Sequence, residues 1–181
     1  RRRPMSGFIF RGTHSSVYGI HTVDQSRTIL PPRREGKIAI PGRSGYYDGV
    51  SGGVYDERQE SILCTFACPK GRTVAEVCRE IAYWLSGTGR LSYDREPDKY
   101  YTARLSGAPP MAQHLKYGEF TLTWSCNPPF AFGRTVSQAI QKGENAVAYA
   151  GTAPTPCVIV LRNVSAASAA NITITAVKRR S

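Results

Sequence analysis

A strictly alternating segment, Gly118–Cys126, constrains the fold of this chain more than any other stretch. Its alternate positions are apolar and would share one face: Phe120, Leu122, Trp124 and Cys126. A period of two residues is typical of a β-strand that buries one face and exposes the other. The segment Ser61–Cys68 has the same pattern, with four positions in one row: Ile62, Cys64, Phe66 and Cys68. We therefore expect a sheet with one buried face.

Shorter segments rich in β-forming residues flank these two. They predict strands over residues 7–10, 17–23, 89–93 and 100–105. Arg11–Ser16 is expected to form a turn between the first two, and the charged stretch Asp94–Lys99 a turn between the last two. The chain thus has several strands with short connections, which is typical of an antiparallel sheet.

One segment has the pattern of a helix instead. Apolar residues recur at helical spacing from Val74 to Leu85 and would line one face. Thr73 and Glu76 have the spacing of a capping box, and Gly87 suits the position after the helix end. Such a helix needs a surface to pack against. We therefore expect Trp84 to lie in the core rather than to form a platform for a ligand.

The stretch Lys37–Val50 begins as a strand and then becomes rich in glycine. Proline donates no hydrogen bond to a ladder, and Pro-Gly and Ser-Gly are turn dipeptides. Long loops that carry arginine and tyrosine commonly contact a partner or another subunit. The alternative is a long hairpin loop without a role. The predicted contact residues are Pro41, Gly42, Arg43, Gly45, Tyr46 and Tyr47.

The composition changes after Val136, where Ala, Ser, Thr and Asn become frequent. Three further strands are expected, over residues 146–149, 157–161 and 171–177. Three strands are few for an independent domain. They either pack on the preceding unit or begin a second β-domain. We therefore divide the chain into a first domain, residues 1–133, and a β-rich C-terminal region, residues 134–181.

The overall composition is that of a soluble globular protein, with 41% hydrophobic and 20% charged residues. No long apolar run occurs, and no charged start precedes an apolar segment, so neither a membrane span nor a secretory signal is expected. The net charge is +11, and the end runs Arg1–Arg3 and Lys178–Arg180 supply six of these charges. Terminal basic runs are commonly solvated tails.

The five cysteines are odd in number and widely spaced, and no C-x-x-C motif occurs, so neither a disulfide framework nor a zinc site is expected. We interpret them as reduced, small core residues of a protein made in a cytoplasm.

The sequence has no nucleophile elbow and no phosphate-binding glycine loop, and its close carboxylates lie in charged turns. It therefore predicts no enzyme and no bound cofactor or metal.

The order of these parts resembles a known family. The parts are Phe8–Gly12, then Ile40–Gly45 with its Ile-Pro-Gly-Arg-x-Gly run, then Tyr55–Arg58 with the strand after it, then the helix, then Phe120–Phe132 with its Asn-Pro-Pro-Phe. Together they are similar to the distal tail proteins of siphophages, the phages with long flexible tails. Ile-Pro-Gly-Arg-x-Gly is the most specific of these elements.

The resemblance implies a mainly β fold with one helix (α+β). This fold is a tail-tube-like β-sandwich or partial barrel with a flanking helix and an extended hairpin. In the family a galectin-like β-domain usually follows and serves host attachment, and residues 134–181 would be an incomplete one. The implied protein is a structural virion component of the tail tip. Six copies would form a ring that connects the tail tube to the tail-tip hub, or baseplate, and lets DNA pass through its centre at ejection.

The implied partners are other copies of the chain, the tail-tube protein and the hub protein, with the tape-measure and receptor-binding proteins as further candidates. DNA would be only a transient occupant of the channel, and assembly would take place in the host cytoplasm. We hypothesise that residues 34–53 join neighbouring subunits, with Arg43 pairing to a carboxylate of the next copy. The alternatives are a tail-tube or tail-terminator protein of a phage or contractile injection device, and a nucleic-acid-binding module that uses the terminal arginines.

Overall fold

The computed structural model describes residues 6–50, 53–107, 109–110, 112–114, 117–164, 166 and 172–175, with only the backbone for residues 112–114. The basic runs at the two ends lie outside these residues. The chain divides into two compact units, residues 1–139 and residues 140–181, and each is described by itself.

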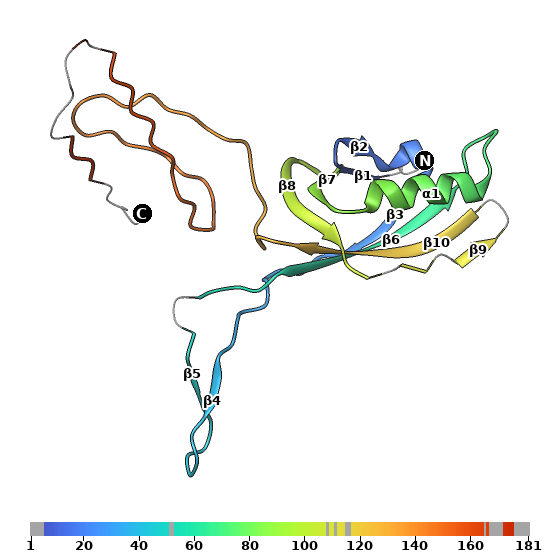
Figure 1. The fold of residues 1–181 in the computed structure, drawn as a ribbon, viewed down its shortest axis with the longest axis horizontal. Helices are drawn as coiled ribbons and strands as arrows, with labels where there is room; N and C mark the ends of the chain where they lie inside the picture. The colour runs from blue at the N-terminus through green and yellow to red at the C-terminus, as the bar shows by residue number, and fades with distance from the viewer. Residues whose placement is uncertain are drawn as a thin grey trace. The chain divides into compact units, whose positions relative to one another are not determined.

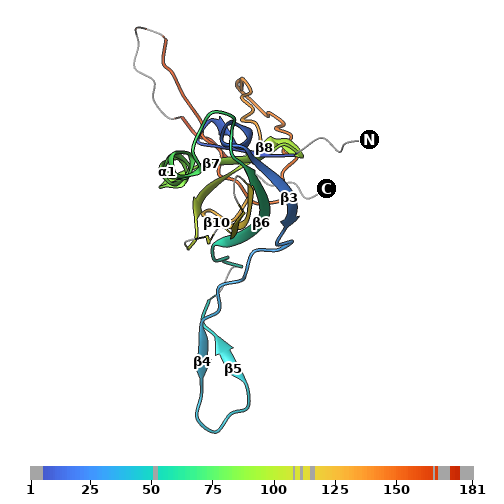
Figure 2. The same ribbon diagram turned by 90° about the vertical axis from the view of Figure 1, so that its right-hand side faces the viewer.

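Eight strands of the first unit form one antiparallel sheet, which curves around the core (Figures 1 and 2). Seven of them follow the order β2-β1-β7-β8-β10-β6-β3, and the eighth, β9, pairs with β10. Their bounds are β1 Phe8–Phe10, β2 Thr13–His14, β3 Ile20–Ser26, β6 Arg58–Ala67, β7 Thr88–Tyr93, β8 Glu96–Leu105, β9 Ala112–His114 and β10 Tyr117–Cys126.

A bridge between Ser6 and Thr22 brings the chain just before β1 beside β3. The N–H of Thr22 donates to the carbonyl oxygen of Ser6 at 2.8 Å, and the two hydroxyl groups are also 2.8 Å apart. Because β1 and β3 stand near opposite ends of the strand order, this bridge curls the sheet into a partial barrel. The expected fold class, mainly β with one helix, is confirmed.

The strands β6 and β10 pair over their full lengths, from Tyr117 opposite Ala67 to Cys126 opposite Arg58. The predicted inward residues of both are buried: Ile62, Cys64, Phe66, Phe120, Leu122, Trp124 and Cys126. Cys68, which was expected in the same row, lies beyond the end of β6 and is only half-buried. Alternation therefore predicted these two strands almost completely.

The helix α1, Val74–Leu85, begins and ends where the sequence predicts. Its capping box is formed, because Thr73 Oγ1 accepts the N–H of Glu76 at 3.4 Å and the Glu76 carboxylate accepts the N–H of Thr73 at 3.1 Å. Trp84 is buried and stacks on Phe8 with ring centroids 5.6 Å apart. The expectation that Trp84 belongs to the core is confirmed.

The strand expected over residues 17–23 begins later than predicted. A short 3-10 helix, η1 (Ser15–Tyr18), takes its first residues, and β3 starts at Ile20. The His14 side chain accepts the N–H of Ser16 at the start of η1, and Gly19 ends it with a φ of 70°. The hydrogen bond from Ser16 and the turn at Gly19 compete with strand pairing, and the alternation of residue types does not reveal either of them.

Two other boundaries also differ from those expected. The strand β8 starts at Glu96, which pairs with Tyr93, so only Asp94 and Arg95 form the turn that was expected over residues 94–99. In the glycine-rich stretch, the chain returns as a strand after Gly45, although that region was expected to be a loop. In both cases pairing with a neighbouring strand extends the regular structure beyond its local sequence signal.

The second unit has no strand among its described residues, 140–164, 166 and 172–175. The strands predicted over residues 146–149 and 157–161 are therefore wrong, and residues 172–175 of the third are not a strand either. Local bonds shape its turns instead, such as that from the Tyr149 hydroxyl to the carbonyl oxygen of Ala153 at 2.5 Å. β-forming residues alone are insufficient here, because a strand needs a neighbour to bond its backbone groups.

The cysteines among the described residues are all free. Cys64 and Cys126 are buried, and burial raises the pKa of each thiol to about 12. The interpretation as small core residues is confirmed for these two. Cys68 and Cys78 are half-buried, and Cys157 is exposed.

Candidate subunit-contact arm

A long hairpin leaves the sheet between β3 and β6 and projects away from it (Figures 1 and 2). We call residues 32–56 the arm; residues 51 and 52 lie outside the described part. Its two-stranded sheet consists of β4, Lys37–Ala39, and β5, Tyr46–Asp48, and all six of these residues are exposed. Backbone bonds continue the ribbon to its base, where the N–H of Asp56 donates to Pro32 at 2.8 Å. The extended hairpin that the resemblance implied is present.

The tip of the arm is a tight turn at the predicted Pro41-Gly42 dipeptide. The N–H of Arg43 donates to the carbonyl oxygen of Ile40 at 3.2 Å, and Gly42 has a φ of 79°. Proline followed by a glycine of positive φ is the arrangement of a type II turn. The guanidinium group of Arg43 is exposed and forms no hydrogen bond or ion pair with a described residue. The turn therefore presents one free cation at the end of the arm.

The two faces of the arm differ in chemistry because of its register. Ile38 lies opposite Tyr47 on one face, and both side chains are more than half exposed. Lys37 lies opposite Asp48 on the other face, where the Lys37 ammonium is 5.0 Å from the ring centroid of Tyr46. Exposed apolar side chains gathered on one face commonly mark an interaction surface. The arm therefore has one apolar face and one charged face.

Asp48 fixes the half of the hairpin that is nearer to the barrel. Its carboxylate accepts the N–H of Val50 at 3.0 Å and the N–H of Gly36 at 3.2 Å. These backbone bonds, the one from Val50 first, lower the pKa of Asp48. An ionised Asp48 thus ties both strands of the arm together on its exposed surface.

The structure places all six predicted contact residues in the half of this hairpin that includes the tip: Pro41, Gly42, Arg43, Gly45, Tyr46 and Tyr47. Their role between subunits remains a prediction. The sequence did not reveal that Tyr47 would lie opposite Ile38, because the register of a hairpin is set by its turn. It also gave no role to Arg58 and Glu60 at the base of the arm, although both are in phase with the buried positions of β6.

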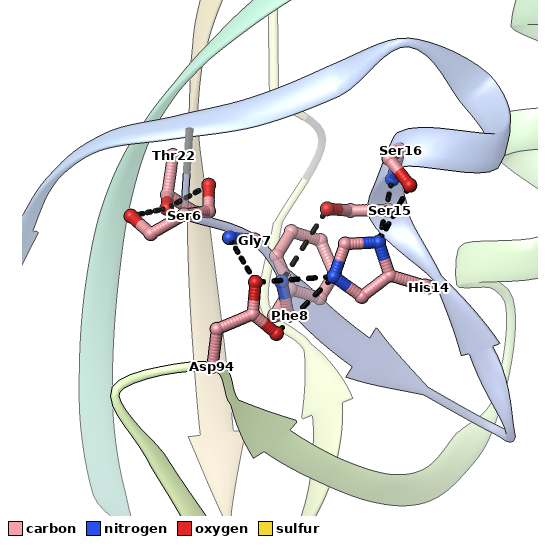
Figure 3. Close-up of polar contacts among 8 residues, drawn as sticks. All are labelled: Ser6, Gly7, Phe8, His14, Ser15, Ser16, Thr22 and Asp94. Carbon is pink, nitrogen blue, oxygen red and sulfur yellow. Dashed lines mark hydrogen bonds and ion pairs between the residues drawn. The ribbon is translucent and has the colours of Figure 1, made fainter. Parts of the chain in front are cut away.

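A second polar cluster surrounds His14 (Figure 3). The Asp94 carboxylate accepts the N–H of Gly7 at 2.7 Å and lies 3.1 Å from Nε2 of His14. Nδ1 of His14 accepts the N–H of Ser16 at 3.2 Å, which leaves the ring proton on Nε2 to be donated to Asp94. The hydrogen bonds among Ser16, His14, Asp94 and Gly7 thus hold the start of β1 against the β7–β8 turn.

No three His, Cys, Asp or Glu side chains among the described residues are grouped so that they could hold a metal. Glu60 is the one buried carboxylate among the described residues, and Arg58 lies beside it at 2.9 Å.

No helix among the described residues combines the length and the apolar character needed to cross a membrane.

Comparison with known proteins identifies the family of the barrel. The sequence model of the phage tail protein RIFT-related domain matches residues 13–126, which is more than half of the chain. This range contains the arm, the helix and most of the barrel strands. No curated protein matches the chain.

Among solved structures, the chain is similar to the Dit protein (gp 19.1) of phage SPP1, described as a paradigm of the hub adsorption apparatus in phages that infect Gram-positive bacteria. The two share 17% sequence identity with a TM-score of 0.57. The match covers 72% of this chain but 53% of the SPP1 protein, so the chain spans about half the length of that structure. At this identity the likeness concerns the fold.

Proposed function

Because the chain belongs to the family of phage tail proteins with a RIFT-related domain, we propose that this tail component is a distal tail protein of the siphophage type. Copies of the chain would close into a six-membered ring at the tail tip. Residues 1–133 would form the ring, and residues 134–181 would correspond to part of a galectin-like domain. The similarity of the barrel's fold to that of SPP1 Dit supports this assignment.

The observation that carries the proposal is the arm. All residues of its strands are exposed, Ile38 and Tyr47 lie on one face, and its tip carries the free cation of Arg43. A hairpin with this surface gains little by standing in water, whereas burial of its apolar face against another copy is favourable. A protruding element that meets a different surface of the next copy is the heterologous contact from which closed rings are built.

In this role the ring connects the tail tube to the tail-tip hub, and DNA passes through its centre at ejection. The partners are the tube protein, the hub protein and further copies of the chain, with the tape-measure and receptor-binding proteins as additional neighbours. The protein acts by its shape and contacts at the tip of the virion tail, after assembly in the host cytoplasm. No chemical step is part of this function.

The test is the native mass of the purified protein by light scattering, together with negative-stain electron microscopy. A distal tail protein gives single or paired rings of six copies with a central pore. Long stacked tubes would contradict the proposal and favour a tail-tube protein. A protein that stays monomeric over the accessible concentration range and also fails to join purified hub protein would contradict both assignments.

A further inference from the structure

The arm joins the barrel next to a buried ion pair. Nε of Arg58 lies 2.9 Å from Oε1 of Glu60, and the two residues are inward-facing neighbours at the start of β6. The Glu60 side chain is completely buried, and that of Arg58 is 12% exposed. The pair therefore lies inside the barrel, at the end of β6 where the arm joins it.

The guanidinium group of Arg58 also reaches across to the other side of the arm. Its Nη2 donates to the carbonyl oxygen of Thr28, which lies two residues after the end of β3. In return, Oγ1 of Thr28 donates to the carbonyl oxygen of Gln59 at 2.7 Å. We call Thr28, Arg58 and Gln59 the arm root, because these contacts join the two chain segments that lead into the arm.

Glu60 is enclosed by apolar and aromatic groups. It lies opposite Trp124 across the sheet, and its charge and the burial of the site both raise the pKa of Tyr93, burial being the larger effect. The amide of Gln25 donates a hydrogen bond to the Glu60 carboxylate at 3.4 Å. Removing a carboxylate from water is expensive, and apolar residues of similar size commonly fill such a site with equal stability. Stability alone therefore does not account for this pair.

We propose that Glu60 is a positioning residue for the arm. The charge of Glu60 holds the Arg58 guanidinium through the ion pair at Nε, so that Nη2 meets the carbonyl oxygen of Thr28, and these two contacts fix the direction in which the arm leaves the barrel. Arginine suits the task because its planar group offers several donors at fixed angles, whereas the ammonium of lysine is a single point. The inference rests on the proposed use of the arm between subunits, and it names the residues that aim it.

The direction of the arm can be measured without reference to ring formation. Spin labels are placed at the tip and on the exposed side of α1 through Ser44→Cys and Arg79→Cys, after Cys68, Cys78 and Cys157 are replaced by Ala. Double electron–electron resonance then gives the distribution of distances between the two labels. An excess of unlabelled chain ensures that only distances within one copy are read. Samples carry Arg43→Glu, so that docking on a neighbour does not order the arm.

Three variants distinguish an effect on the direction of the arm from an effect on the stability of the fold. Glu60→Gln and Arg58→Lys are each expected to broaden the distance distribution about twofold, because the first removes the charge that holds the guanidinium and the second replaces its planar group with a single ammonium. The double variant R58M/E60L refills the site with apolar groups, so we expect it to unfold near the Tm of the parent chain and still to show the broad distribution. Arg104→Gln, which removes the exposed Arg104–Glu57 pair beside the root, is the matched control and should keep the narrow distribution.

A narrow distribution in a folded R58M/E60L variant would overturn the proposal, because the pair would then act only as filling of the core. Broadening by Arg104→Gln as large as that by Glu60→Gln would also overturn it. A different result would contradict the proposed function, namely the persistence of rings in the Arg43→Glu variant. If Arg43→Glu leaves rings intact, the arm is not the subunit contact, while the distance distributions still decide whether Glu60 aims it.

Discussion

The indole nitrogen of Trp84 donates a hydrogen bond of 2.9 Å to the carbonyl oxygen of Phe10. This bond joins the last turn of α1 to β1, across 74 positions of the chain. The same indole ring stacks on Phe8 and lies 4.8 Å from the ring of Tyr18. One side chain therefore fixes the helix to the first strand of the barrel by both a polar and an apolar contact.

We expect Trp84→Phe to reduce the free energy of unfolding by about 1–3 kcal/mol, since the variant loses the hydrogen bond to Phe10 and part of the buried ring. Urea unfolding followed by circular dichroism measures the change. Tyr83→Phe is the matched control, because Tyr83 is 80% exposed on the same helix and its loss of a hydroxyl should matter by less than about 0.5 kcal/mol. Equal effects of the two variants would contradict the anchoring role.

Gly19 occupies a position where a side chain would be strained. It has a φ of 70°, and a Cβ atom there would lie 2.0 Å from the carbonyl oxygen of Ala67 on β6. We expect Gly19→Ala to cost roughly 3 kcal/mol or more, because neither backbone can move away within the sheet. Gly12→Ala is the control, since Gly12 also has a positive φ but has open space where the Cβ would lie. It should cost about 1–2 kcal/mol, and thermal unfolding distinguishes the two.

The charge at the arm tip provides the direct test of the subunit contact. We expect Arg43→Glu to leave the Tm within a few degrees of the parent, because the side chain is exposed, and to abolish rings in negative-stain images. Arg79→Glu makes the same change of charge on the exposed side of α1 and should leave rings intact. Rings of normal size from Arg43→Glu would refute the role of the tip.

Asp48 predicts a pH dependence of the arm. Its pKa in the folded chain is lower than in the unfolded chain, chiefly because Val50 and Gly36 donate backbone bonds to the carboxylate. The stabilisation is therefore fully present above the unfolded value of about 3.9 and is lost as the pH falls through the lower folded value.

Amide exchange of Gly36 and Val50 reports this loss directly. Protection of both amides, corrected for the intrinsic rate, should decrease in the parent chain as the pH falls below about 4. In the Asp48→Asn variant, protection should be weaker at neutral pH and nearly independent of pH. Retained protection in the parent well below this range would show that the backbone ladder alone holds the arm.

The barrel strands and the helix were largely determined by the sequence itself. The alternation in β6 and β10, the stripe from Val77 to Leu85 and the capping box at Thr73 are local patterns, and local patterns survive whatever the strands pair with. The same holds for the arm tip, where Pro41-Gly42 encodes its turn through the permitted φ angles of two residues. These features could be read from the chain alone.

Tertiary structure decided the features that depend on a partner distant in the chain. The Ser6–Thr22 bridge curls the barrel, the Ile38–Tyr47 register gives the arm its apolar face, and the Arg58–Glu60 pair lies inside a strand pattern that otherwise predicts apolar residues. Residues 157–161 show the converse, since β-forming side chains without a pairing strand did not make a strand. Periodicity specifies which face of a segment can be buried, but only packing in three dimensions specifies what buries it.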